Sequence, residues 1–352
     1  MNGRDPTIEA MWPVRYEDHL FRAFGVDPQA FAAERGWVRA FRELSSAIQK
    51  VEAEGGSSGP RKDEGGDLQL LRALVYGQRT YLWVRRLQRW LGSVDRELWD
   101  LGGGTGAGAL AWTDGGARQA VVVDHADPGP ARALWSGLEA SIRFEPGNLR
   151  SGVEGGRTAL WAFSLREACP RPRQAAEHLV TWCQKGHCGL VLEPGTRISA
   201  RWVQEVRDAL KDRVPVAGPC RAQGACPRNA GGSDWCHFSW RIGHGPEATR
   251  LLQRAGRDPS VLHASWLALG EGGPSSGHRL LDVRPKGKVL RLHFCSPQGE
   301  TVGEVARRDR ARWRQMRTWR PGDRVEDRQL DLGTSQTVRW TQGAGPTRVE
   351  SD

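Results

Sequence analysis

Four cysteines carry the most specific chemistry in this 352-residue sequence. Cys220, Cys226 and Cys236 lie in one stretch rich in glycine and proline, and Cys295 follows much later. Their spacing is too loose for the Cys-x2-Cys pair of a zinc ribbon, but it suits a loop wrapped around a metal or cluster. Thiolates favour zinc or an iron–sulfur cluster over hard cations. The sequence therefore predicts a soft-metal site, with these candidates for its fourth ligand: Cys295, His237, His244 and His293.

A second candidate site is the glycine-rich segment from Trp99 to Gly108, which follows a predicted strand and precedes a predicted helix. Glycines in this context permit a tight turn and let a ligand lie against the backbone. Asp124, at the end of the next predicted strand, could accept hydrogen bonds from ribose hydroxyls. No Lys-Ser or Lys-Thr follows the glycines, which excludes a Walker loop but not a nicotinamide site.

The string Asp100-Leu-Gly-Gly-Gly-Thr-Gly resembles the first motif of the Rossmann-like S-adenosylmethionine-dependent methyltransferases. This resemblance implies that the acid and the glycines cradle the amino-acid end of the cofactor, while Asp124 holds the ribose. The segment after a later predicted strand, Ala162-Phe-Ser-Leu-Arg-Glu, lacks the Asn/Asp-Pro-Pro-Tyr clamp of exocyclic-amine methyltransferases. We therefore assign no catalytic residue from the sequence. The sequence shows no acid/base set that would support a nicotinamide oxidoreductase.

The composition points to a polyanionic partner. The formal net charge is +10 and the pI is about 9.7, so nucleic acid is the first candidate, against a chain that is merely arginine-rich. We find no apolar stretch of the ~20 residues that a bilayer-spanning helix needs, and no signal peptide at the N-terminus. We expect a cytoplasmic protein without a membrane partner. Seven cysteines in a reducing compartment favour ligands and buried thiols over disulfides.

The pattern of apolar residues predicts an α/β fold. Short buried-strand candidates alternate with helical segments after residue 96, which indicates a Rossmann-like methyltransferase domain with a mostly parallel sheet and helices on both faces. An N-terminal helical region precedes it and a small β-rich C-terminal unit follows. The predicted parts are a helical region at 1–95 with a flexible linker at 54–67, the methyltransferase domain at 96–272 with its cysteine loop at 218–238, a basic β-rich unit at 273–335, and a disordered tail at 336–352.

The order of these motifs resembles a known family. The glycine loop is followed by Leu192-Glu-Pro-Gly-Thr-Arg, by Ala217-Gly-Pro-Cys with Gly-Ala-Cys-Pro, and by Asp234-Trp-Cys-His-Phe-Ser. The combination is similar to the methyltransferase-like assembly factors of the mitochondrial small ribosomal subunit and their bacterial relatives. The helix around Tyr76 departs from the family pattern because it lacks a proline.

The resemblance implies a function and a set of ligands. It implies a structural [4Fe–4S] cluster, with zinc as the alternative, on Cys220, Cys226, Cys236 and Cys295. It implies S-adenosylmethionine binding by Asp100, Gly102, Gly104, Gly106 and Asp124. The protein would bind small-subunit ribosomal RNA during assembly or translation, as a monomer when off the ribosome. The alternative is an active S-adenosylmethionine-dependent rRNA methyltransferase.

If the cysteine loop feeds the start of a parallel strand, we expect it at the sheet edge opposite the cofactor crevice.

Overall fold

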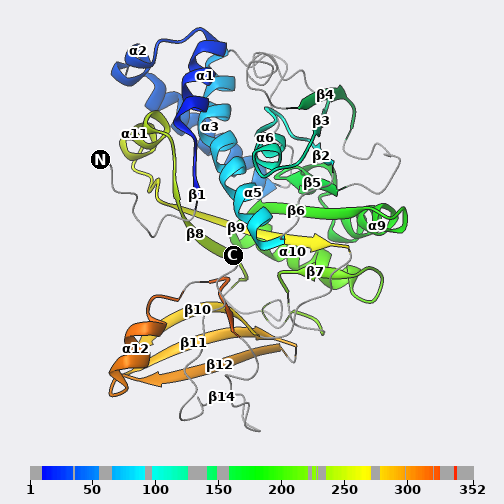
Figure 1. The fold of residues 1–352 in the computed structure, drawn as a ribbon, viewed down its shortest axis with the longest axis vertical. Coiled ribbons are helices and arrows are strands. Elements are labelled where there is room, and N and C mark those ends of the chain that lie inside the picture. Colours follow the sequence, from blue (N-terminus) through cyan, green and yellow to red (C-terminus); the bar gives the residue numbers. More distant parts are fainter. Residues whose placement is uncertain are drawn as a thin grey trace.

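The fold is taken from a computed structural model of the chain (Figure 1). The residues that it describes are 10–34, 36–54, 66–91, 97–125, 141–148, 158–220, 224–226, 228, 235–270, 278–297, 299–319, 321–325 and 337–338. The predicted linker at 54–67 and the predicted tail at 336–352 lie mostly outside these residues. Within the described part, no helix is long and apolar enough to cross a membrane.

The N-terminal region is helical, as the sequence predicts, with one exception at its start. Its helices are α1 (Val14–Phe24), α2 (Pro28–Ala33), α3 (Gly36–Glu54), α4 (Gly66–Leu71), η1 (Arg72–Gly77) and α5 (Gln78–Leu91). The exception is β1 (Ala10–Met11), which pairs in parallel with β8 (Phe238–Gly243). The turn η1 is π-helical, a geometry that is frequent at functional sites.

A nine-stranded sheet forms the centre of the fold. Its order is β1-β8-β9-β6-β5-β2-β3-β4, and β7 also pairs with β9. The remaining strands are β2 (Leu98–Leu101), β3 (Ala120–Asp124), β4 (Ile142–Pro146), β5 (Thr158–Ala162), β6 (Cys188–Pro194), β7 (Val216–Gly218) and β9 (Val261–Leu269). The strands β2 to β6 pair in parallel, while β9 runs antiparallel to β6, β7 and β8. This mostly parallel sheet confirms the predicted fold class.

Helices cover both faces of the sheet because alternate side chains of its buried strands point to opposite sides. On β3, Val122 packs into the core beneath the N-terminal helices, whereas Val121 and Val123 pack into the core on the other face. The first face also carries α6 (Ala107–Asp114) and α11 (Pro246–Arg254). The second face is covered by α8 (Leu165–Ala168), α9 (Pro172–Gln184) and α10 (Arg197–Leu210).

The C-terminal part forms a second sheet, which lies at one end of the molecule (Figure 1). Its order is β13-β10-β11-β12-β14, with an antiparallel meander at its centre. Its elements are β10 (His278–Lys286), β11 (Val289–Ser296), β12 (Gly299–Ala306), α12 (Arg310–Met316), β13 (Arg324–Val325) and β14 (Thr337–Val338). This unit has a small core of its own, to which Phe294, Met316 and Trp319 belong.

The register of the antiparallel strands corrects one expectation about the cysteine loop. Ala264 of β9 pairs with Pro194, the last residue of β6, and also with Phe238, the first residue of β8. The start of β8 is therefore level with the carboxyl end of β6. The cysteine loop, which feeds β8, ends at the same edge of the sheet as the glycine loop. The expectation that it lies at the opposite edge is wrong.

Candidate functional site

A crevice of about 620 Å³ opens at the carboxyl ends of β2, β3, β5 and β6. The glycine loop and the start of β9 form part of its wall. Residues of α1, α3 and η1 form another part, so the N-terminal helices help to enclose it. In an open α/β sheet, ligands bind beyond the carboxyl ends of the strands. This crevice is therefore the candidate cofactor site.

Asp100 is the buried acid of the crevice, with only 1% of its surface exposed. Its Oδ2 accepts a hydrogen bond from the Ala109 N–H at 2.9 Å, while its Oδ1 has no partner among the described residues. Burial raises the pKa of Asp100 to about 7, with the charge of Asp124 adding to the shift and the Ala109 N–H opposing it. A buried carboxylate oxygen that lacks a donor fits a cationic group, such as the amino group of S-adenosylmethionine.

The glycines allow the loop to fold closely around this carboxylate. Gly102, Gly104 and Gly106 have φ values of 72°, 53° and 78°, which L side chains rarely adopt. A Cβ on Gly108 would lie 2.7 Å from Asp100 Oδ2, closer than real Cβ atoms come. Gly102 and Gly104 line the crevice, whereas Gly106 is the N-cap of α6 and is not among the lining residues. The residues present thus fit a cofactor that lies against the backbone.

Asp124 lies beside the loop, at the end of β3. Its Oδ2 accepts a hydrogen bond from the Gly104 N–H at 2.9 Å, and its Oδ1 is 3.2 Å from Nδ1 of His125. The carboxylate therefore holds the glycine loop while also lining the crevice. A carboxylate in this position fits hydroxyl donors such as those of a ribose. The predicted role of Asp124 in cofactor binding remains a prediction.

Phe163 also lines the crevice, although it was not predicted from the sequence as a site residue. It follows β5 and has a φ of 62°, an outlier for a bulky side chain. Its N–H donates to the Leu192 carbonyl at 2.7 Å, and the next residue, Ser164, donates from Oγ to the Leu101 carbonyl at 2.6 Å. Such strain costs about 1–3 kcal/mol and clusters at ligand sites. No sequence signal for this conformation exists, since glycine is the residue that usually marks it.

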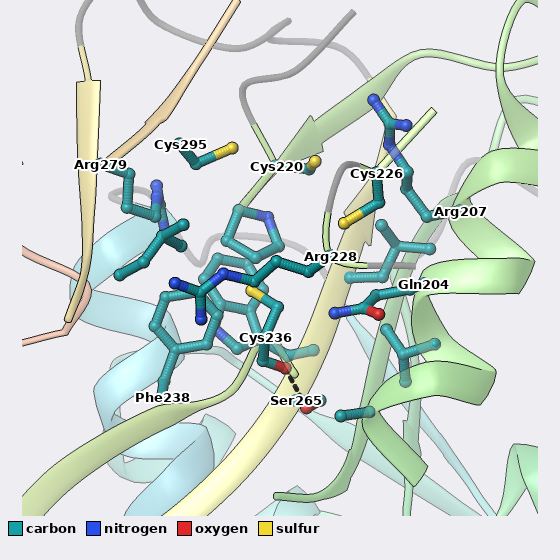
Figure 2. Close-up of a pocket in the computed structure, with 16 residues that line it drawn as sticks. Gln204, Arg207, Cys220, Cys226, Arg228, Cys236, Phe238, Ser265, Arg279 and Cys295 are labelled. Carbon is teal, nitrogen blue, oxygen red and sulfur yellow. Dashed lines mark hydrogen bonds between the residues drawn. The ribbon is translucent and has the colours of Figure 1, made fainter. Parts of the chain in front are cut away.

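The four predicted ligand cysteines line a second, smaller cavity of about 50 Å³ (Figure 2), here called the thiol cavity. Cys220 follows β7, Cys226 lies in the loop, Cys236 precedes β8 and Cys295 lies on β11. The cavity therefore joins the central sheet to the C-terminal sheet. The predicted candidates His237, His244 and His293 are not among its lining residues.

The three remaining cysteines belong to other parts of the fold. Cys183 is in α9 and Cys188 is in β6, while Cys169 is buried at the end of α8. None of the three lines the thiol cavity.

The thiols of Cys220, Cys226 and Cys236 in the thiol cavity favour the protonated form when no cation is present. A hydrogen bond with Cys295, together with burial, raises the pKa of Cys220. Burial is the main cause that raises the pKa of Cys226, and it raises the pKa of Cys236 to about 12. A bound metal reverses this preference because thiolate is the ligating form.

Three arginines that were not predicted from the sequence also line the thiol cavity. Figure 2 shows Arg279 on the side of Cys295 and Arg207 on the side of Cys226. Arg228, in the cysteine loop, donates from Nε and Nη2 to the two carboxylate oxygens of Glu300 on β12, at 3.1 Å each. The positive charges of these guanidinium groups would balance the negative charge of a thiolate-ligated centre.

The four cysteines have the chemistry of a soft-metal site but not its finished geometry. Among the described residues, no group of three or more His, Cys, Asp or Glu side chains is arranged so that it could hold a metal ion. The donor set of four thiols around one cavity nevertheless fits zinc or an iron–sulfur cluster in ligand type and number.

The crevice and the thiol cavity share one wall, the three residues before β8. Trp235 and His237 line the crevice, and Cys236 between them lines the thiol cavity, as expected for alternating side chains of an extended chain. Trp235 donates from Nε1 to the Gly195 carbonyl at 2.9 Å, and the Cys236 carbonyl accepts from Ser265 Oγ at 2.9 Å.

Solved structures with a similar arrangement include several methyltransferases. A candidate RNA methyltransferase from Pyrococcus horikoshii is 10% identical, with 64% of this chain and 99% of that chain covered and a TM-score of 0.35. The magnesium protoporphyrin IX methyltransferase of Synechocystis, solved with S-adenosylmethionine, is 10% identical and has a TM-score of 0.37. The match covers 60% of this chain and 87% of that chain. The [4+2]-cyclase SpnF is 13% identical and has a TM-score of 0.34. The match covers 65% of this chain and 93% of that chain.

A comparison with protein families gives a match to one segment of the chain. No curated protein matches at the level required for significance. The segment at 160–255 contains the end of β5, the strands β6, β7 and β8, and three of the four cysteines of the thiol cavity. Over these residues the chain matches the family described as mitochondrial small ribosomal subunit Rsm22, which confirms the predicted resemblance to small-subunit factors on this segment.

Proposed function

We propose that this protein is a methyltransferase-like factor that binds the RNA of the small ribosomal subunit. The observation that carries the proposal is the family match at 160–255, because that segment contains the shared wall of the crevice and the thiol cavity. The proposed partner is ribosomal RNA. The proposed cofactors are S-adenosylmethionine in the crevice and a metal centre in the thiol cavity.

A basic surface on the C-terminal unit supports RNA binding. The residues around α12 include five exposed arginines, Arg307, Arg308, Arg310, Arg314 and Arg317. The one acid in this stretch, Asp309, caps α12 and lies 3.6 Å from Arg312. Clustered guanidinium groups of this kind bind phosphates through bidentate hydrogen bonds and charge.

Co-sedimentation with small-subunit precursors tests the proposal. We expect binding at low salt. The slope of the logarithm of the binding constant against the logarithm of the salt concentration should become shallower by about 0.7–0.9 for each phosphate contact removed. Arg310→Gln together with Arg314→Gln should reduce the salt slope. A matched pair on the opposite side of the fold, Arg39→Gln with Arg254→Gln, serves as the control. Absence of association at low salt contradicts the proposal.

For the thiol cavity we propose a [4Fe–4S] cluster on Cys220, Cys226, Cys236 and Cys295, with zinc as the alternative. When bound, such a cluster would join the cysteine loop to β11 and so fasten the C-terminal sheet. Supporting this role, Cys295 lies on a strand of the C-terminal sheet, whereas the other three cysteines lie in the segment between β7 and β8 of the central sheet. Ligand binding energy in such sites is folding energy, so the centre would act in architecture.

Anaerobic purification with metal analysis tests the identity of the centre. Iron with absorbance near ~400 nm is expected for a thiolate-ligated cluster. Cys226→Ser should lower the metal content, whereas the control Cys183→Ser, outside the thiol cavity, should not. Stoichiometric zinc in a colourless protein overturns iron. Equal metal content in both variants overturns the assignment of the ligands.

A second candidate function is an active S-adenosylmethionine-dependent rRNA methyltransferase. The unpartnered Oδ1 of Asp100, in a crevice of about 620 Å³, favours it. Calorimetry with S-adenosylmethionine tests the cofactor that both functions share, and transfer of a methyl group to RNA separates the two functions. If neither the wild type nor the His125→Ala variant binds S-adenosylmethionine, the enzyme is excluded. Binding followed by transfer of a labelled methyl group to small-subunit RNA establishes it.

A further inference from the structure

The crevice extends well beyond the residues that fit the cofactor. Asp100, Gly104 and Asp124 lie at the ends of β2 and β3, which are neighbours in the sheet. Other lining residues belong to β9 and to the segment before β8, three and four strands away from β2. With neighbouring strands ~4.8 Å apart, these residues are roughly 14–19 Å along the sheet from the glycine loop. A cofactor held by the glycine loop leaves space for a second ligand.

This far half of the crevice carries planar aromatic and imidazole side chains. The rings of Trp235 and His237 are stacked, with centroids 5.4 Å apart and an interplanar angle of 30°. The ring of His263, at the start of β9, lies 5.6 Å from that of His237. Phe163 lines the cavity between these rings and the glycine loop, at the end of β5. Planar faces of this kind are the usual surface on which a nucleobase stacks.

A cationic donor lies in the same half. Arg79 of α5 lines the crevice, and its buried Nε has no hydrogen-bond partner among the described residues. Burial contributes most to lowering the pKa of the His263 imidazole, and the neighbouring His237 and the charge of Arg79 lower it further. A guanidinium donor beside stacked rings is suited to a base carbonyl or a phosphate oxygen.

We infer that the far half of the crevice is a subsite for an unstacked nucleobase of single-stranded RNA, formed by Phe163, Trp235, His237, His263 and Arg79, here called the base subsite. The assignment of RNA rests on the proposed function. The subsite is distinct from the cofactor position and is formed in part by the two neighbours of Cys236. Its geometry therefore depends on the same loop that lines the thiol cavity.

Binding of a fluorescein-labelled single-stranded RNA octamer, compared with an abasic octamer of equal length, tests the base subsite. Base stacking contributes about 1–3 kcal/mol per base, so Trp235→Ala should weaken octamer binding about 5- to 150-fold. Binding of the abasic octamer, which retains the phosphates, should be unchanged. Saturating S-adenosylmethionine should not displace the RNA octamer.

Three further variants separate stacking from loss of structure. Trp235→Phe keeps an aromatic face but loses the hydrogen bond to Gly195, so it should retain most of the octamer affinity. His125→Ala alters an exposed residue at the cofactor end of the same crevice and should not affect octamer binding. Cys236→Ser should weaken octamer binding while S-adenosylmethionine binding, measured by calorimetry, is retained.

Each contrary result identifies which idea fails. Equal octamer affinity in wild type and Trp235→Ala overturns the base subsite, as does equal loss of both octamers or displacement by S-adenosylmethionine. If ribosomal co-sedimentation persists in that case, the proposed function stands without the subsite. If co-sedimentation fails while the Trp235-dependent octamer binding is present, the proposed partner is wrong and the subsite stands.

Discussion

Replacing Asp100 by Asn should stabilise the ligand-free protein while weakening its binding of a cationic cofactor. Asp100 is fully buried in the crevice wall, and burial raises its pKa from the ordinary 3.8 to about 7. Between these two pH values the native state keeps a proton that the unfolded state has lost. The free energy of unfolding must therefore fall as the pH rises through this window, by 1.36 kcal/mol per pH unit.

The size of the effect follows from the two pKa values. A difference of about three units corresponds to about 4 kcal/mol of lost stability above pH 7, of which about 3 kcal/mol is lost between pH 5 and pH 8. Asp100→Asn removes this loss and keeps an oxygen to accept from the Ala109 N–H. Its buried NH2 group costs about 1–3 kcal/mol if it finds no partner. The variant should therefore be about 1–3 kcal/mol more stable than wild type at pH 8.

Urea denaturation of both proteins at pH 5 and pH 8 measures this difference. Groups that titrate alike in the two proteins cancel when their free energies of unfolding are subtracted. The stability of the variant relative to wild type should rise by about 3 kcal/mol from pH 5 to pH 8. A difference that is independent of pH refutes the raised pKa, and a variant less stable at pH 8 refutes the burial cost.

The same carboxyl group predicts proton release when a cation binds. A positive group beside Oδ1 lowers the pKa of Asp100, so a proton held at pH 6 leaves on binding. Calorimetry of S-adenosylmethionine in buffers of different ionisation enthalpy should show about one proton released at pH 6 and almost none at pH 8. The Asn variant should bind more weakly, without proton release at either pH.

Three other substitutions test the contacts around the sites. Glu17→Ala removes a buried carboxylate that accepts from two N–H groups at the start of α11, so the thermal midpoint should fall with a loss of about 2–4 kcal/mol. Gly108→Ala should cost about 1–3 kcal/mol and impair cofactor binding, whereas Gly66→Ala, with open space around its Cβ, should do neither. Burial raises the pKa of Glu300, but hydrogen bonds from His293 and Arg228 outweigh it and lower the pKa to about 2. The wild-type free energy of unfolding should therefore fall by up to about 3 kcal/mol as the pH falls from 4.5 towards 2. In acid denaturation, Glu300→Gln should lose less stability over that range.

The cofactor half of the site could be predicted from the sequence because its determinants are local. Asp100, the glycines and α6 follow one another in the chain, and Asp124 ends the next strand. Positive φ at Gly102 and Gly104 is what a glycine in such a turn implies. The left-handed Phe163 could not be predicted, since its conformation depends on hydrogen bonds from its neighbourhood to β2 and β6.

The position of the cysteine loop could not be predicted because it depends on pairing between distant segments. Its location follows from the register of β8 on β9 and of β9 on β6, and a sequence pattern does not specify that register. The two-residue strand β1 is too short to show an alternating pattern, so a helix was predicted in its place. In both cases the partner strand, rather than the local sequence, determines the structure.

The protein contacts around the thiol cavity also bear on what a metal centre would add there. The cysteine loop is tied to β12 by Arg228 and Glu300, and to α10 by two contacts of 3.2 Å from the Cys226 N–H to the Asp208 carboxylate. These contacts hold the loop between the two sheets without a metal. Their presence means that the centre is not the sole connection between the sheets. Its larger effect would be on the short segment at Cys236, where the same three residues form the walls of both cavities. Loss of the centre should therefore alter the crevice before it releases the C-terminal sheet.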